Sequence, residues 1–324
     1  MRTSIVAFAL APIAFVLAAN APVHAETFPS RPVTLIVPFP PGGSTDLAAR
    51  LMADKMGAAL GQPVVVENMG GAGGSIAVGR LARAVPDGYT IDIGQWDTHV
   101  GSIIYNLNYD LQTDFAPIGL ISINPQLLLA PKAFPADDMK ALVAWMKAHP
   151  GDAKFVNQNA TAQVGGLLLQ KLTDTKVLFI PYRGAGPAMT DLISGQVDLL
   201  LVQGAVALPQ VRAGTIKALV NLAPQRSPSM PDIPSADEAG VPGFYMLGWF
   251  GFFAPKGTPP EAITKLNTAM VQALADPGLR AKFASFGLDV AAREQQTPTG
   301  LAAFHKAEIE KWWPIIKAAG IRGE

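Results

Sequence analysis

The sequence contains no cysteine, and this absence excludes several kinds of protein and site. Without a thiol the chain forms no disulfide, offers no thiolate nucleophile and binds no metal through sulfur. Lipid-anchored bacterial lipoproteins are excluded too, because those proteins carry an acceptor cysteine after their signal sequence. A hydrophobic content of 49% and a charged content of 15% instead indicate a globular protein that is held together by a large core.

Net charge and histidine are also scarce. Lys plus Arg and Asp plus Glu number 25 each, so the formal net charge is zero and no basic field attracts nucleic acid. Of the four histidines, His99 alone is expected near the end of a strand, and one histidine cannot supply a metal site by itself. We therefore expect no nucleic-acid partner, no metal and no cofactor.

Motifs of common enzyme families are missing. The sequence has no G-x-x-x-x-G-K-[ST] phosphate loop, and Ile76 occupies the last glycine position of the nearest approach to G-x-G-x-x-G. No G-x-S-x-G motif occurs, because Asp46 stands where the glycine after Ser44 would be. A triad of Ser44, His99 and an aspartate is conceivable. Since no credible nucleophile–base pair is visible, we expect no enzyme, and a hydrolase or isomerase is the less favoured alternative.

The first 25 residues are typical of a targeting segment. Arg2 gives a short basic start, an apolar run of 15 residues follows, and Val23 and Ala25 occupy the small-residue positions of a cleavage site. A membrane anchor is the alternative, but the run contains Pro12 and is shorter than the about 20 residues that span a bilayer. We predict a signal peptide at residues 1–25, cleavage after Ala25 and export to the periplasm.

The remaining chain alternates strand-like and helix-like segments. Apolar runs at residues 31–39, 62–69 and 87–94 indicate strands, and a helical pattern follows the first two. This alternation predicts parallel strands that are joined by right-handed crossovers. In such sheets, ligands bind beyond the carboxyl ends of the strands.

Two long apolar segments, Asp114–Phe134 and Tyr245–Gly257, indicate strands that cross between two lobes. A length of 324 residues is also typical of about two domains. We predict an α/β fold of two lobes, each a mostly parallel sheet flanked by helices, with a ligand cleft between them. Lobe one comprises residues 26–122 and 245–324, and lobe two comprises residues 123–244. Two crossings would hinge the lobes about the cleft.

Three glycine-rich turns are expected at strand ends, namely Pro41–Asp46, Gly70–Ser75 and Pro181–Pro187. Glycine lets the backbone approach a ligand closely, and the N-terminus of the following helix offers unpaired N–H groups and a partial positive charge. Any one of these segments is equally well interpreted as a tight turn, with Ser44 or Thr45 as an ordinary helix cap. Together, the three turns predict a shared site for an anion.

The chain resembles a known family over about residues 28–321. The segments "VPFPPGGSTDLAARLMADKMG", "MGGAGGSIA", "PDGYT" and "PYRGAGPAMTDLISGQVD" are similar to those of the periplasmic solute receptors of tripartite tricarboxylate transporters, also called the Bug family. The resemblance implies a hinge-closing receptor that binds carboxylates, amino acids or small aromatic acids without catalysis. It also implies delivery to integral-membrane transporter subunits, and we expect a monomer. A ligand-sensing receptor for a membrane signalling protein has the same fold and stays open as an alternative.

The resemblance implies that the loops Pro41–Asp46 and Gly70–Ser75 hold a carboxylate through backbone N–H groups and ordered waters. One segment, "GQWDTHV", departs from the short Gly/Thr-rich turn that is usual in the family. Trp96 would add a flat apolar wall there. Asp97 either turns away from a carboxylate or pairs with an amine or amide of the ligand. Arg183 either pairs with a carboxylate or bridges to the other lobe.

The candidate ligand-binding residues come from both lobes. Those of lobe one are Pro41, Gly42, Gly43, Ser44, Thr45, Asp46, Gly73, Gly74, Ser75, Trp96, Asp97 and Thr98. Those of lobe two are Asn159, Thr161, Tyr182, Arg183 and Gln203. Within this set, Asp46 is interpreted first as a partner of the helix dipole, and Asn159 equally as the cap of the helix that follows it.

Overall fold

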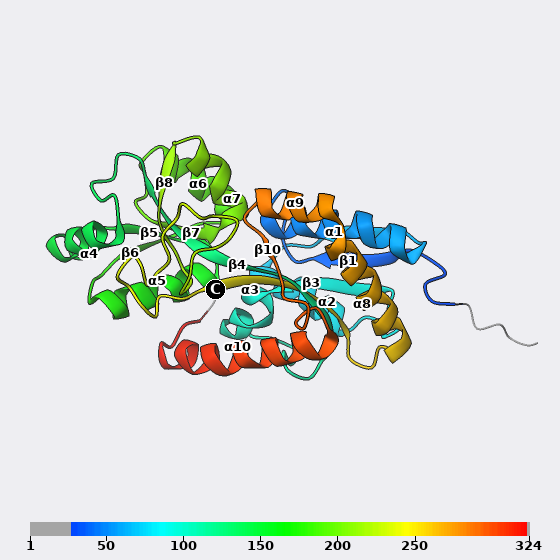
Figure 1. The fold of residues 1–324 in the computed structure, drawn as a ribbon. Helices are drawn as coiled ribbons and strands as arrows, with labels where there is room; N and C mark the ends of the chain where they lie inside the picture. The colour runs from blue at the N-terminus through cyan, green and yellow to red at the C-terminus, as the bar shows by residue number, and fades with distance from the viewer. Residues whose placement is uncertain (1–26, 323–324) are drawn as a thin grey trace, which may run out of the picture.

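The computed structural model describes residues 27–322. The predicted signal peptide and its cleavage site after Ala25 lie outside the described residues. The described chain forms two lobes, and strand β4 (Phe115–Pro131) runs from one to the other with β9 (Leu247–Pro255) beside it (Figure 1). The predicted α/β fold class with two lobes is confirmed, and the proposed lobe boundaries stay a prediction.

The sheet of lobe one runs in the order β10-β4-β9-β3-β1-β2. Its other strands are β1 (Val33–Val37), β2 (Val64–Asn68), β3 (Thr90–Gln95) and β10 (Asp289–Val290). Strand β1 pairs in parallel with both β2 and β3, as the alternation of strands and helices predicts. The antiparallel pairs come from the crossing strands, because β9 lies antiparallel between β3 and β4.

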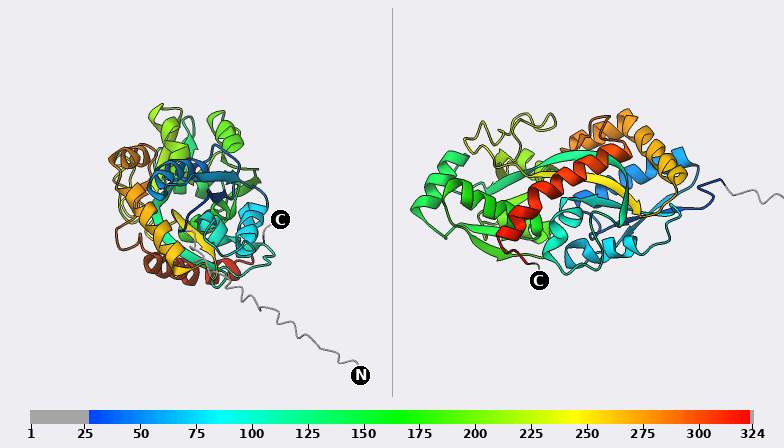
Figure 2. Two further views of the ribbon diagram at one scale, coloured as in Figure 1. Left: turned by 90° about the vertical axis from the view of Figure 1, so that its right-hand side faces the viewer. Right: turned by 90° about the horizontal axis from the view of Figure 1, so that it is seen from below.

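Helices cover both faces of this sheet. Alternate residues of β1 enter different apolar clusters, since Leu35 belongs to a cluster with side chains of α1, α8 and α9 while Ile36 belongs to one with side chains of α2 and α10. These helices are α1 (Ser44–Leu60), α2 (Ser75–Ala82), α8 (Pro260–Ala275), α9 (Pro277–Ser285) and α10 (Pro298–Ala318). Short turns complete the lobe: η1 (Ala72–Gly74), α3 (Trp96–His99) and η2 (Gly101–Ile104). Seen from below, α10 runs obliquely along the molecule (Figure 2).

Lobe two is built around the second half of β4. Residues 126–129 of β4 pair with β7, and residues 127–131 pair with β8, both antiparallel. Strand β5 pairs in parallel with β6. The strands are β5 (Lys154–Asn157), β6 (Leu178–Pro181), β7 (Leu200–Gln203) and β8 (Ile216–Asn221). The helices are α4 (Met139–Ala148), α5 (Ala160–Thr173), α6 (Ala185–Ile193) and α7 (Gly204–Arg212).

The beginnings of the helices differ in a way that matters for the site. Helices α4, α5, α9 and α10 each begin at a side chain that accepts a hydrogen bond from a first-turn N–H group. Within residues 27–322, no side chain caps α1, α6 or α7 in this way. The first-turn N–H groups of these three helices are therefore left for other partners.

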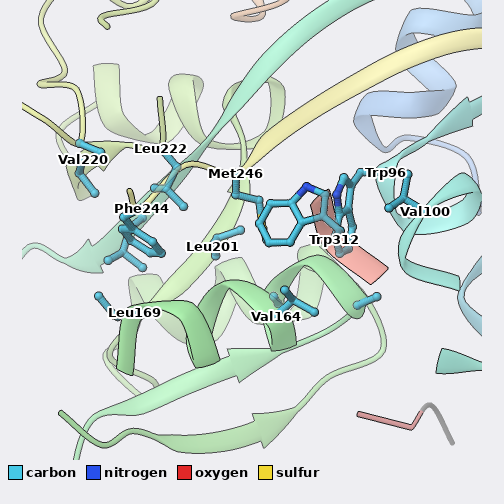
Figure 3. Close-up of a cluster of buried hydrophobic side chains, with 14 of the residues drawn as sticks. Trp96, Val100, Val164, Leu169, Leu201, Val220, Leu222, Phe244, Met246 and Trp312 are labelled. Atoms are coloured by element: carbon cyan, nitrogen blue, oxygen red, sulfur yellow. The ribbon is translucent and has the colours of Figure 1, made fainter. Parts of the chain in front are cut away.

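An apolar cluster contains side chains from both lobes. Trp96 and Trp312 meet edge to face with ring centroids 5.3 Å apart, and Val164, Leu201 and Met246 lie beside them (Figure 3). The side chain of Trp96 is only 1% exposed. The indole that was expected as a wall of the ligand site thus packs inside the core, where it joins α3 to α10.

No helix within residues 27–322 is both long and apolar enough to cross a membrane.

The core of lobe one encloses a carboxyl group on β3 and an imidazole on α3. Asp92 and His99 are fully buried, and Asp92 Oδ2 lies 3.7 Å from His99 Nε2. Neither carboxyl oxygen of Asp92 has a hydrogen-bond partner among the described residues. Burial raises the pKa of Asp92 well above its usual value. Burial, together with the nearby His305, lowers the pKa of His99 well below its usual value, so burial disfavours the charged form of both groups.

Replacing Asp92 with Asn is expected to raise the melting temperature at pH 7 more than at pH 4. The unfolded carboxyl ionises above its ordinary pKa of 3.8, whereas the buried one holds its proton to higher pH. Folding of the parent therefore takes up a proton, and its free energy of unfolding falls as the pH rises through this window. Asparagine carries no ionisable group, so this fall in the free energy of unfolding is absent from the variant.

Thermal unfolding followed by circular dichroism at pH 4 and pH 7 provides the measurement. Asp54→Asn on the exposed surface of α1 makes the same chemical change outside the core and serves as the control. An Asp92→Asn variant that melts lower than the parent by the same amount at both pH values would contradict the argument.

Candidate functional site

A cavity of about 470 Å³ lies between the lobes, and we call it the interlobe cavity. Lobe one contributes the loop after β1 and the end of β3. Lobe two contributes the ends of β5, β6 and β7 with the starts of the helices that follow. The lining residues are Phe39, Pro40, Pro41, Gly42, Gly43, Ser44, Thr45, Gln95, Asp97, Gln126, Gln158, Asn159, Arg183, Gly184, Ala185, Gly186, Pro187, Leu201, Val202, Gln203 and Val206.

The loop between β1 and α1 presents backbone N–H groups to this cavity. Gly42 adopts a φ of +91°, which L side chains rarely reach, and its N–H donates to Asp46 Oδ2 at 3.0 Å. This bond closes the turn and places Gly43 at the start of α1. No side chain caps the helix there, and the N–H groups of Ser44 and Thr45 have no acceptor among the described residues.

Asp46 does not line the cavity, but its hydrogen bonds hold this loop in place. Its carboxylate also accepts hydrogen bonds from Asn68 Nδ2 at 2.9 Å and from Arg50 Nε at 3.0 Å. Burial alone would raise the pKa of Asp46, but the hydrogen bonds from Arg50, Gly42 and Asn68 outweigh it, so the pKa lies below its usual value. Asp46 therefore stays ionised and fixes the turn.

Three helix N-termini converge on the interlobe cavity. Helix α1 enters from lobe one, while α6 begins after Gly184 and α7 begins after Gln203 in lobe two. Each uncapped N-terminus carries a partial positive charge of about half an elementary charge. Arg183 adds a full positive charge to the lining and makes no ion pair within the described residues. This arrangement suits an anion.

Glutamine side chains supply further hydrogen-bond donors. Gln203 Oε1 accepts from Ser44 Oγ at 2.6 Å, and Gln95 Oε1 accepts from Thr45 Oγ1 at 3.0 Å. Because these carbonyl oxygens are engaged, the amide NH₂ of Gln203 remains available to a ligand, whereas that of Gln95 also lies 3.5 Å from Asp97 Oδ2. The bond between Ser44 and Gln203 also joins the two lobes. Sequence reasoning found Gln203 but missed Gln95 and Gln126, although a glutamine within the apolar run "INPQLLLAP" is a signal that could have revealed the latter.

Asp97 lines the cavity but points its carboxylate to lobe two. Its Oδ1 accepts a hydrogen bond from the backbone N–H of Thr161 at 2.9 Å and another from Thr161 Oγ1 at 2.8 Å. Asp97 is 6% exposed. Burial raises the pKa of Asp97, and the two hydrogen bonds from Thr161 limit the rise.

Several predicted site residues do not line the interlobe cavity. They are Asp46, Gly73, Gly74, Ser75, Trp96, Thr98, Thr161 and Tyr182. A side chain at Gly74 would meet Thr98 Cγ2 at 2.6 Å, and one at Gly73 would meet the ring of Tyr105. The second glycine loop is thus packed against its own lobe. Tyr182 donates to Asp191 and so ties the loop before α6 to that helix.

The remaining predicted residues all line the cavity. They are Pro41, Gly42, Gly43, Ser44, Thr45, Asp97, Asn159, Arg183 and Gln203. Asn159 also caps α5, since its Oδ1 accepts from the N–H of Ala162 at 2.9 Å. The interpretation of Asn159 as a helix cap is confirmed, and its contact with a ligand stays a prediction.

The structure does not assemble the conceivable catalytic triad. The hydroxyl of Ser44 donates to Gln203, whereas the fully buried His99 has its Nδ1 3.0 Å from Thr98 Oγ1. Residues 27–322 contain no group of three or more acidic or histidine side chains that could hold a metal ion. A larger hollow of about 800 Å³ beside the end of α10 is lined by η2 and residues such as Trp313 and Lys317, and no helix N-terminus opens into it.

Comparison with known proteins agrees with this geometry. The family model described as tripartite tricarboxylate transporter family receptor matches residues 48–321. Protein BugT of Bordetella pertussis is 36% identical over 307 residues, which cover 93% of each chain.

Solved structures give the same picture. MatC from Rhodopseudomonas palustris, solved with bound malate, matches with a TM-score of 0.82 and 39% identity over 89% of this chain and 100% of that chain. R. palustris Rpa4515, solved with adipate, matches with a TM-score of 0.84 and 32% identity over 91% and 99% of the two chains. The chain therefore belongs to the solute-binding receptors of the tripartite tricarboxylate transporter family, the Bug family that its sequence resembles.

Proposed function

We propose that this receptor captures a small organic acid in the interlobe cavity and delivers it to membrane transporter subunits. The observation that carries the proposal is the convergence of α1, α6 and α7, three helices without side-chain caps, on one cavity that also contains Arg183. Their free N–H groups and dipoles stabilise a carboxylate. The bound malate and adipate of the two related structures support this ligand class.

The contacts follow from the lining. The N–H groups of Ser44 and Thr45 donate to the carboxylate, and the loop Pro41–Gly43 lets the backbone approach it closely. The amide NH₂ of Gln203 and the guanidinium of Arg183 reach it from lobe two. Charge-assisted hydrogen bonds of this kind are shorter and about twice as strong as neutral ones. The ligand is a carboxylate, an amino acid or a small aromatic acid.

Closure of the hinge traps the ligand. Both lobes supply walls of the cavity, so a ligand that contacts both stabilises the closed state by its differential affinity for it. The crossing strands β4 and β9 connect the lobes and form the hinge. The hydrogen bond between Ser44 and Gln203 joins the two lobes across the cavity and supports this proposal.

Location and partners follow from the family. Receptors of this family are periplasmic, so residues 1–25 act as a signal peptide that is removed after Ala25. The mature receptor works as a monomer that docks on integral-membrane transporter subunits, and it does not catalyse a reaction.

A thermal-shift screen of monocarboxylates and dicarboxylates is expected to give at least one strong hit. A ligand at about 100 times its Kd adds roughly 2.7 kcal/mol to the free energy of unfolding. A screen in which sugars, peptides or metal ions shift the melt and no carboxylate does so would refute the proposed ligand class.

Gly43→Val is expected to weaken carboxylate binding by about 10- to 150-fold. This is the affinity that the loss of one charge-assisted hydrogen bond costs. Gly43 has φ −83° and ψ 173°, which a valine tolerates, and a Cβ placed there meets no atom within 4 Å. The fold therefore accepts the side chain, whose methyl groups fill the space beside the N–H groups of Ser44 and Thr45.

Isothermal titration calorimetry on the folded variants measures this effect. Ala59→Val, at the exposed far end of α1, puts the same side chain in the same helix away from the cavity and should leave affinity unchanged. If Gly43→Val binds as tightly as Ala59→Val, the loop after β1 is a structural turn and not a carboxylate site.

Export is expected to remove the first 25 residues. N-terminal sequencing of the receptor from the periplasmic fraction should begin at Glu26, because Val23 and Ala25 provide the small side chains that the signal peptidase requires. Periplasmic protein that begins at Met1 would contradict the predicted signal peptide.

A further inference from the structure

Asp97 occupies a position at the interlobe cavity that the proposed function does not use. It stands at the start of α3 in lobe one, and its carboxylate reaches the first turn of α5 in lobe two. Oδ1 accepts from both the N–H and the hydroxyl of Thr161, at 2.9 and 2.8 Å. A carboxylate of the protein itself thus satisfies this helix N-terminus across the cleft.

This occupation distinguishes α5 from the other helices that begin at the cavity. Asn159 accepts from the N–H of Ala162 in the first turn of α5, and Asp97 accepts from the N–H of Thr161, the residue before it. Among the described residues, α1, α6 and α7 have no such side-chain partner. The N-termini of α1, α6 and α7 are therefore free to bind an anion of the ligand. At the N-terminus of α5, the carboxylate of Asp97 already fills that role.

The two oxygens of Asp97 are not equally engaged. Oδ2 lies 3.4 Å from Asn159 Nδ2 and 3.5 Å from Gln95 Nε2, which are long contacts. Oδ2 therefore retains the capacity to accept a hydrogen bond from a ligand donor. A second ligand carboxylate at this end would instead meet a fixed negative charge. At an effective dielectric constant of about 20, like charges about 6–12 Å apart weaken binding by roughly 10- to 100-fold.

We propose that Asp97 makes this receptor selective for monocarboxylates whose far end carries a hydrogen-bond donor, and that it rejects dicarboxylates. The ligand carboxylate lies at the N-termini of α1, α6 and α7. A hydroxyl, amide or ammonium group at the other end of the ligand donates to Asp97 Oδ2. This inference rests on the proposed function, since it assigns the ligand class of the same cavity.

The test uses pairs of ligands of equal length that differ at one end. Suitable pairs are 4-hydroxybutanoate with succinate, 5-hydroxypentanoate with glutarate and 6-hydroxyhexanoate with adipate. Calorimetry of the parent is expected to show that the hydroxy acid of the best-fitting pair binds at least about 10-fold more tightly than the diacid. A parent that prefers the diacid in every pair overturns the inference without any variant.

Asp97→Asn removes the charge and retains the shape. Its Oδ1 still accepts from Thr161, so the contact between the lobes persists, and the ratio of hydroxy-acid to diacid affinity should fall by about 10- to 100-fold. Asp54→Asn on the exposed face of α1 makes the same change of charge and should leave the ratio as in the parent. An Asp97→Asn variant with an unchanged ratio overturns the inference.

Thr161→Val separates the charge of Asp97 from its contact with lobe two. The variant keeps the backbone N–H donor and the charge, but loses the hydroxyl donor. Both affinities should therefore fall together while their ratio stays within about twofold of the parent. A change of ratio as large as that of Asp97→Asn would show that lobe contact, not charge, sets the preference.

Failure of the inference and failure of the proposed function give different results. If neither the parent nor any variant binds any acid, the proposed function is wrong. If acids bind but the ratio of hydroxy-acid to diacid affinity does not depend on Asp97, the proposed function is retained and the selectivity assigned to Asp97 is wrong.

Discussion

The first turn of an α-helix cannot satisfy its own N–H groups, and this constraint organises the molecule. Helices α9 and α10 begin away from the cavity and find an acceptor in the side chain one residue before them, although α2 and α8 begin there without a side-chain cap. Helices α1, α6 and α7 begin at the interlobe cavity and have no such acceptor among the described residues. The glycine turns, the buried Asp46 that fixes one of them and the shape of the cavity all serve to hold these open helix ends in one place.

The parts of the fold that local patterns encode were predictable from the sequence. The apolar run at residues 31–39 contains β1, and the glycine turn after it leads into α1. The long segment Asp114–Phe134 contains β4 and crosses between the lobes as expected. These features depend on side-chain period and turn chemistry within about ten residues, which a single sequence displays directly.

Other features of the candidate site depend on packing between distant segments. Trp96 was expected to face a ligand, yet its indole packs on Trp312, more than two hundred residues away in the chain. The loop Gly70–Ser75 resembles the first glycine loop, but Thr98 and Tyr105 close against it. The pairing of Asp97 with Thr161 likewise appears only when the two lobes are brought together. No local pattern distinguishes a cavity wall from a core wall in these cases.

The shared strand β4 has a consequence for how such receptors diversify. One continuous strand contributes hydrogen bonds to the sheets of both lobes, pairing with β9 up to Pro125 and with β7 and β8 from Gln126 onward. A recombination event that exchanged lobe two with that of a relative would have to join two halves of a single strand in register. A slip of one residue would turn every following side chain to the opposite face. Exchange of a whole lobe would therefore have to preserve the register of β4, whereas substitution of single residues along the cavity leaves this strand intact.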